Sequence, residues 1–210
     1  RKSVVLLKND GTLPLTGEKL AGKKVYAQCF NKNPEAGEKA TTGLREQLAG
    51  HLTLTEDYRE ADVAILLLSP SSGEYFNATP GYLELDLCED KEVANVDEQG
   101  RPTAETHRET TLSGVGQIGE IARAVHGRGG KVIANVNVTL AWELGSVEPL
   151  CDALLAGFDT YSSATLDVVF GRFSPTGKLP ITLPRGDEVL AVNAENAATY
   201  CRQVYDAGYS

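Results

Sequence analysis

The run from Ala61 to Leu68 constrains the fold more than any other stretch, because it is almost entirely apolar and Pro70 stops it. A strand without alternating polar residues is typical of a central parallel strand that is covered on both faces. Buried strands of the same kind are expected at Lys24–Phe30 and Lys131–Val138. The three runs predict a sheet with helices packed on both of its faces.

Segments with the periodicity of amphipathic helices separate these runs. Helices are expected at residues 42–49, 114–125 and 162–170. Short strands are expected at residues 52–55 and 153–158, while residues 147–155 also show helical spacing. Ser162 or Ser163 is expected to cap the last helix. Strands that alternate with helices predict an α/β fold with a mostly parallel sheet.

The stretch after this last helix combines a helix end, a turn and a short strand. Gly171 follows apolar residues at helical spacing and suits a helix C-cap, and Pro175 with Gly177 makes a turn. Residues 179–183 alternate apolar with small or polar side chains between prolines. This pattern predicts one antiparallel edge strand, so the expected architecture is an α/β sandwich.

Two segments break the alternation of strands and helices. Residues 2–7 are expected to form a short helical piece, ended by Gly11 and Pro14, whose apolar side chains need a partner surface. Residues 83–110 are long and charged and contain Gly100-Arg101-Pro102. Such a segment is typical of an insertion or hairpin on the rim of a sheet.

Composition excludes several classes of partner. Hydrophobic residues make up 41% of the 210, which is enough for a proper core, and a net charge of −9 argues against nucleic acid or an anionic membrane surface. No apolar run approaches the roughly 20 residues of a membrane span. Arg1-Lys2 precedes an apolar run too short for a signal peptide, and the chain has no methionine, so we expect a fragment or a processed product.

The cysteines and histidines give no metal or redox motif. Cys29, Cys88, Cys151 and Cys201 are far apart and form no C-x-x-C pair. We expect free, buried thiols, which favour a reducing compartment and hence a cytoplasmic protein. His51, His107 and His126 lack the spacing of metal ligands, so neither a metal nor another cofactor is expected.

Two stretches carry a family resemblance. Gly171 to Pro184, which reads Gly-Arg-Phe-Ser-Pro-Thr-Gly-Lys-Leu-Pro-Ile-Thr-Leu-Pro, resembles the signature near the end of the α/β sandwich domain of glycoside hydrolase family 3. Ser3 to Leu15 resembles the segment by which that family passes from its catalytic barrel into the sandwich. The resemblance implies that residues 1–15 are a linker from a missing N-terminal barrel, and that residues 16–210 form the sandwich domain with an insertion at 83–110.

The resemblance also implies a function. Members of this family remove β-linked sugars from chain ends with retention, using an Asp nucleophile on the barrel and a general acid/base. Ser72-Gly73-Glu74 matches the loop that carries the acid/base, so Glu74 is the catalytic candidate. Because the nucleophile of the family lies on the barrel, the isolated chain is expected to be inactive. Tyr75, Phe76 and His107 are the candidate substrate-binding residues, and a β-glycoside or oligosaccharide is the expected substrate. The reserve acid/base candidates are Glu84, Asp86 and Glu89.

Other functions stay open on the sequence alone. A non-catalytic carbohydrate-binding or interaction domain would not need Glu74. A flavodoxin-like ligand-binding domain would require that the G-x-G-x-x-G pattern at Gly114–Gly119 contacts a phosphate, but no clear strand precedes that pattern. Without a barrel, exposed apolar residues 4–7 would favour self-association into a homo-oligomer.

Overall fold

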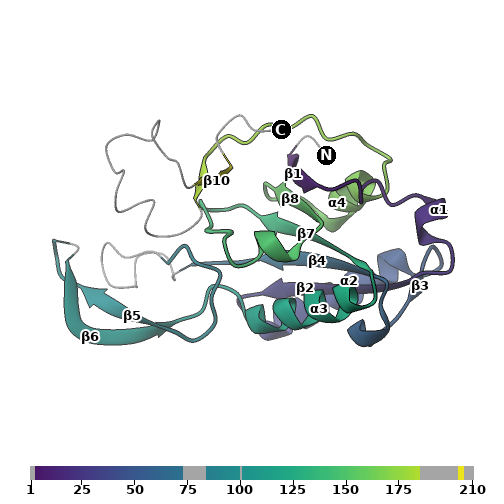
Figure 1. Cartoon of the computed structure of the whole chain (residues 1–210). Coiled ribbons are helices and arrows are strands. Elements are labelled where there is room, and N and C mark those ends of the chain that lie inside the picture. Colours follow the sequence, from purple (N-terminus) through teal and green to yellow (C-terminus); the bar gives the residue numbers. More distant parts are fainter. Residues whose placement is uncertain (1–2, 73–83, 100, 185–202, 206–210) are drawn as a thin grey trace.

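The computed structural model describes residues 3–72, 84–99, 101–184 and 203–205. Its centre is a six-stranded sheet with the strand order β1-β8-β7-β4-β2-β3 (Figure 1). The strands are β1 (Val4–Asn9), β2 (Lys24–Asn31), β3 (Thr53–Leu54), β4 (Val63–Ser69), β7 (Lys131–Asn137) and β8 (Ala153–Gly157). All neighbours pair in parallel except β1, which is antiparallel to β8. The expected α/β sandwich is confirmed.

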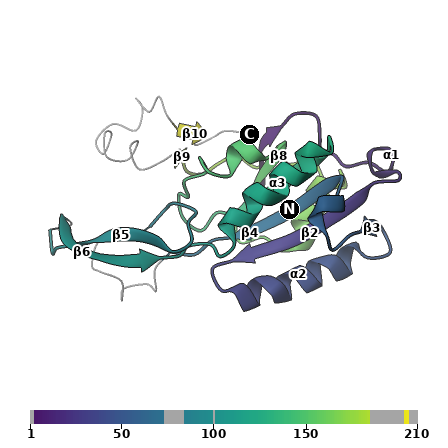
Figure 2. The ribbon, with the colours of Figure 1, turned by 60° about the horizontal axis from the view of Figure 1, so that its bottom comes forward.

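Helices cover both faces of the sheet. One face packs against α3 (Val115–Gly127), and the other packs against α2 (Pro34–Leu48) and α4 (Ser162–Val169). Figure 2 shows α3 lying across the sheet and α2 running beside β2. Strand β4 serves both cores, because Leu66 and Leu68 face α3 whereas Ile65 faces α2 and α4. This two-sided burial explains why the strand has no polar alternation.

The remaining elements lie outside this sheet. They are α1 (Gly17–Leu20), the 3₁₀ turns η1 (Tyr58–Glu60) and η2 (Glu148–Leu150), the strands β5 (Lys91–Val96) and β6 (Pro102–Glu109), and the strands β9 (Leu183–Pro184) and β10 (Gln203–Tyr205). Strands β5 and β6 form the expected hairpin, which extends from one end of the sheet (Figure 1).

The expectation of a helix at residues 2–7 is wrong. These residues enter strand β1, whose Val4 pairs with Gly157 and whose Asn9 pairs with Ala153. Four consecutive apolar residues fit either periodicity, and only the distant partner β8 decides between them. Because Val4, Val5 and Leu7 are at most 1% exposed within this chain, they do not form the expected apolar patch.

Four further expectations need correction. Residues 147–155 contain only the turn η2 and the start of β8, because the chain becomes extended again at Cys151. Helix α2 begins at Pro34 rather than near residue 42, with Asn33 as its N-cap. Helix α4 begins after Tyr161, with no side-chain cap, although Gly171 ends it in the expected left-handed conformation. Of the expected edge strand at residues 179–183, only Leu183 lies in a strand, which it forms with Pro184 and which pairs with β10 in a separate small sheet.

Candidate functional site

The parallel strands end together at one edge of the sheet. Their last residues are Asn31 in β2, Ser69 in β4, Asn137 in β7 and Gly157 in β8. Strand β3 lies on one side of β2 and β4 on the other, so the order in which successive strands are added to the sheet reverses between β2 and β4. Ligands of open α/β sheets bind beyond the carboxyl ends of the strands at such a point.

The loop that carries the catalytic candidate leaves from this edge. It starts after β4, where the Ser71 amide donates a hydrogen bond to the Thr111 carbonyl (2.9 Å) and Ser72 is only 2% exposed. Glu74, Tyr75 and Phe76 lie outside the described residues. The described root of their loop is therefore hydrogen-bonded to the segment that connects β6 with α3.

Of the reserve carboxylates, Glu84 and Asp86 surround Lys91 at the base of the hairpin. Lys91 Nζ lies 3.2 Å from a Glu84 oxygen and 3.3 Å from an Asp86 oxygen. Glu84 is 2% exposed and also accepts a hydrogen bond from the Asp86 amide (2.9 Å). Burial alone would lower the pKa of Lys91, but the hydrogen bonds and charges of the two carboxylates outweigh it and raise that pKa.

Thr111 ties the two strands of this base together. Its hydroxyl donates to the Asp86 carbonyl (2.6 Å) and accepts from the Cys88 amide (2.9 Å), while its own amide donates to the Cys88 carbonyl (2.9 Å). Nearby, Glu89 accepts a hydrogen bond from the Gly114 amide (2.9 Å). All three reserve carboxylates thus have structural partners. No sequence pattern indicates the roles of Lys91 and Thr111, because these roles depend on contacts between distant residues.

His107 lies further out on the hairpin, opposite Val93. Its Nδ1 is 2.6 Å from Asn95 Oδ1, and its Nε2 is 3.0 Å from Glu109 Oε1. Because side chains alternate along strands, His107, Glu109, Asn95 and Lys91 share one face of the hairpin. The structure therefore places His107 in a polar row with Lys91, but it does not describe Glu74, so their juxtaposition stays a prediction.

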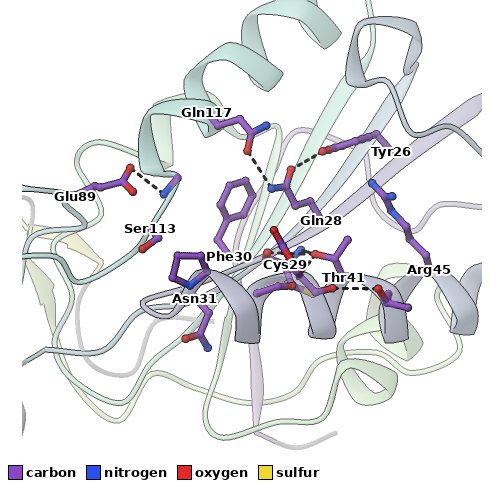
Figure 3. A pocket seen from close by; sticks show the side chains of 15 residues that line it. Tyr26, Gln28, Cys29, Phe30, Asn31, Thr41, Arg45, Glu89, Ser113 and Gln117 are labelled. Carbon is purple, nitrogen blue, oxygen red and sulfur yellow. Dashed lines mark hydrogen bonds between the residues drawn. The ribbon is translucent and has the colours of Figure 1, made fainter.

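A cavity of about 500 Å³ lies beside β2, between α2 and the start of α3 (Figure 3). Side-chain hydrogen bonds cross its wall: the Tyr26 hydroxyl donates to Gln28 Oε1 (2.5 Å), and Gln28 Nε2 donates to Gln117 Oε1 (3.0 Å). The Arg45 guanidinium stands 5.4 Å from the centre of the Tyr26 ring. Such a wall is polar and internally bonded.

The same cavity borders an open strand edge. Strand β3 pairs only with Lys24 and Val25, so the rest of β2 lacks a neighbouring strand on that side. Helix α2 compensates, because Arg45 Nε donates to the Ala27 carbonyl (3.0 Å) and the Thr41 hydroxyl accepts from the Cys29 amide (2.9 Å). These side chains occupy the backbone groups that an added strand would use.

The G-x-G-x-x-G pattern opens α3 but does not form a phosphate site of the dinucleotide type. A turn rather than a strand precedes Gly114, whose positive φ of 76° suits glycine. A Cβ at Gly114 would lie 3.3 Å from the Phe30 ring. The Gly114 amide already binds the Glu89 carboxylate, which would repel a phosphate. Gly114 therefore packs closely against Phe30 just before the helix, whereas a Cβ at Gly116 or Gly119 would meet no atom within 4 Å.

Three further observations concern metals, thiols and membranes. In the described ranges, no three side chains of metal-ligand type gather into a possible metal site. Cys29, Cys88 and Cys151 are free thiols, and burial raises the pKa of Cys29 to about 11 and that of Cys151 to about 12. Cys201 lies outside the described residues. Among the helices that the structure describes, none is long and apolar enough to cross a bilayer.

Comparison with solved structures finds the same fold in β-glucosidases. β-Glucosidase 3B from Thermotoga neapolitana, solved with glycerol, is 22% identical with a TM-score of 0.51, covering 87% of this chain and 29% of that one. A β-glucosidase from Erythrobacter marinus is 16% identical with a TM-score of 0.56, covering 99% and 33%. The β-D-glucoside glucohydrolase from Trichoderma reesei is 20% identical with a TM-score of 0.52, covering 90% and 30%.

These likenesses define the class of domain: an α/β sandwich that forms about a third of a longer chain in those proteins. Residues 4–210 match the family described as "Glycosyl hydrolase family 3 C-terminal domain", and the chain belongs to that family. The family resemblance inferred from the two sequence motifs is confirmed. A comparison with curated proteins found no match.

Proposed function

We propose that this chain is the sandwich domain of a retaining glycoside hydrolase that removes β-linked terminal sugars, and that Glu74 is its general acid/base. The observation that carries the proposal is the family match over residues 4–210. β-Glucosidases among the solved structures share the fold, which agrees with a glucoside-like substrate.

The geometry of the carboxyl edge supports this role for the Glu74 loop. The loop leaves from β4 at the point where the strand order reverses, and β1 starts at the same edge because Val4 pairs with Gly157. A barrel joined before residue 4 would therefore enter at the edge of the sheet from which the loop leaves. Tyr75, Phe76 and His107 are proposed to contact the sugar, since aromatic faces and polar hairpin groups suit such a ligand.

The nucleophile of this reaction is proposed to lie outside the 210 residues, because the solved relatives are about three times as long as the segment that they share with this chain. We expect the isolated chain to show no turnover of aryl β-glucosides, as a retaining mechanism needs both carboxyl groups. Release of the aryl group by the pure chain, above an identical sample inactivated by heat, would contradict this.

The role of Glu74 is tested in the longer enzyme by Glu74→Ala. A general acid contributes about 10²–10⁴-fold, so hydrolysis of unactivated disaccharides should fall by that order. Activated aryl glucosides need little protonation and should still form the glycosyl-enzyme, whose breakdown azide should accelerate because it needs no general base. Glu92→Ala, which removes a hairpin carboxylate on the opposite face, serves as the matched control and should keep normal rates. Normal disaccharide turnover by Glu74→Ala would exclude Glu74.

A further inference from the structure

A second cavity, of about 420 Å³, opens at the carboxyl edge of the sheet between α2 and α4, on the face away from α3. Polar side chains from four elements and a loop line it: Ser69, Asn135, Asn137, Gln47, Thr160 and Ser162. Asp159 is the only charged residue in its described lining. The cavity thus presents neutral amides and hydroxyls around one carboxylate.

Two polar atoms in this lining are buried without a partner. Asn135 is 7% exposed, and its Oδ1 accepts no hydrogen bond from the part of the chain that the structure describes; the Thr160 hydroxyl is likewise unpaired there. Their neighbours are satisfied, because Asn137 Oδ1 accepts from the Asp159 amide (3.0 Å) and Ser162 donates to Gln47 (3.1 Å). Buried groups of this kind are normally hydrogen-bonded, so these two atoms leave unused hydrogen-bonding capacity at the base of the cavity.

Gly157 makes room for both groups. A Cβ at this position would lie 2.5 Å from the Thr160 hydroxyl and 3.1 Å from the Asn135 amide nitrogen. In the turn that follows, Asp159 has a φ of 49°, a backbone conformation that residues other than glycine rarely adopt. This turn brings the chain back, so that Thr160 lies against Gly157. The end of β8 is therefore shaped to keep Asn135 and Thr160 together at the base of the cavity.

We propose that this cavity is a binding site for a neutral, hydroxyl-rich ligand, namely a sugar unit, held by Asn135 and Thr160. Amides and hydroxyls both donate and accept hydrogen bonds, as sugar hydroxyls require. No cationic side chain lines the described cavity to hold an anion, and Asp159 would repel one. Its volume lies in the usual range for small-molecule sites, and the partly buried Leu67 offers apolar surface to the carbon skeleton.

This site is independent of the proposed catalytic role, because none of its residues belongs to the Glu74 loop. Its test is binding by the 210-residue chain, which carries its own core on both faces of the sheet. The probes are glucose and cellobiose, with inorganic phosphate as the anionic alternative. In two-dimensional ¹⁵N–¹H spectra, the sugars should produce saturable shifts at the amides of Asn135, Gly157 and Thr160.

Two variants remove the proposed contacts. Asn135→Leu and Thr160→Val, which are similar in size to the natural residues, should each weaken sugar binding about tenfold, the loss expected for one hydrogen bond. Asn135→Leu should also leave the melting temperature unchanged or higher, because it removes an unpaired buried polar group. Gln117→Leu, in the cavity beside β2, is the matched control and should bind sugar normally.

Several results would overturn the proposal. These are the absence of saturable shifts with both sugars, tighter binding of phosphate than of sugar, or loss of binding in Gln117→Leu rather than in the two variants. A lowered melting temperature of Asn135→Leu with unchanged affinity would show that Asn135 has a structural role instead. Thr160→Val decides the question if Asn135→Leu does not fold. A failure here would leave the hydrolase test with Glu74→Ala unaffected.

Discussion

Leu7→Ala tests whether the first strand is an integral part of this domain. Leu7 is 1% exposed and packs in the core beneath α3, together with Val5. The register of β1 against β8 shifts between Leu6 and Lys8, so Leu7 lies at a bulge and stabilises the fold by packing rather than through a cross-strand pair. Truncating a leucine at such a site costs about 2–5 kcal/mol.

The assay is urea unfolding of the 210-residue chain, followed by the fluorescence of its single tryptophan, Trp142, which is fully buried. The midpoint should fall while the dependence of the free energy on urea stays the same. Leu6→Ala, at a partly buried neighbour on the other face, is the matched control and should cost less. A loss below about 1 kcal/mol for Leu7→Ala would refute the reasoning, because a flexible linker would give that result.

Two further predictions concern the opposite, amino-terminal edge of the sheet. A hydrogen bond from Lys131 Nζ (2.8 Å) is the main cause that lowers the pKa of Asp10 to about 2. The stabilisation of the fold by ionised Asp10 is therefore present above pH 4 and is lost as the pH falls toward 2. Lys131→Met should make the free energy of unfolding depend less on pH in that window, and an unchanged dependence would contradict this. Gly130→Ala would place a Cβ 2.4 Å from the Asp62 carbonyl oxygen and should cost about 1–3 kcal/mol in urea unfolding, so a variant as stable as the parent would show that this approach is not tight.

The central strands could be predicted from the sequence because each is a mostly apolar run of consecutive residues, which indicates a strand that is buried on both faces. Val63 to Leu68 leaves no helical or alternating pattern to compete with a covered strand. Strand β1 could not be predicted in this way, since the same kind of run near the chain start is decided by pairing with β8. The early start of α2 was readable, because Asn33-Pro34-Glu35 combines an N-cap, a first-turn proline and an acidic residue.

The candidate site shows a similar division. The sequence predicted the end of β4, which the structure confirms, and a motif match after that strand end makes Glu74 a candidate whose role stays a prediction. It could not reveal that Thr111 and Lys91 hold the base of the hairpin, or that Asn135 and Thr160 meet over Gly157. Those arrangements bring together residues that are far apart in the chain. In the sequence alone, each of these residues looks like any other polar residue of a loop or strand.

The pairing of β1 with β8 also governs the order in which the domain can assemble during synthesis. Its first strand leaves the ribosome about 150 residues before the strand that completes it. Until β8 emerges, Val4, Val5 and Leu7 have no sheet to join, and contacts between such distant residues form slowly because a long loop must close first. Strand β1 is therefore exposed to aggregation in the meantime, and a chaperone that holds residues 4–9 until β8 emerges should raise the yield of folded domain.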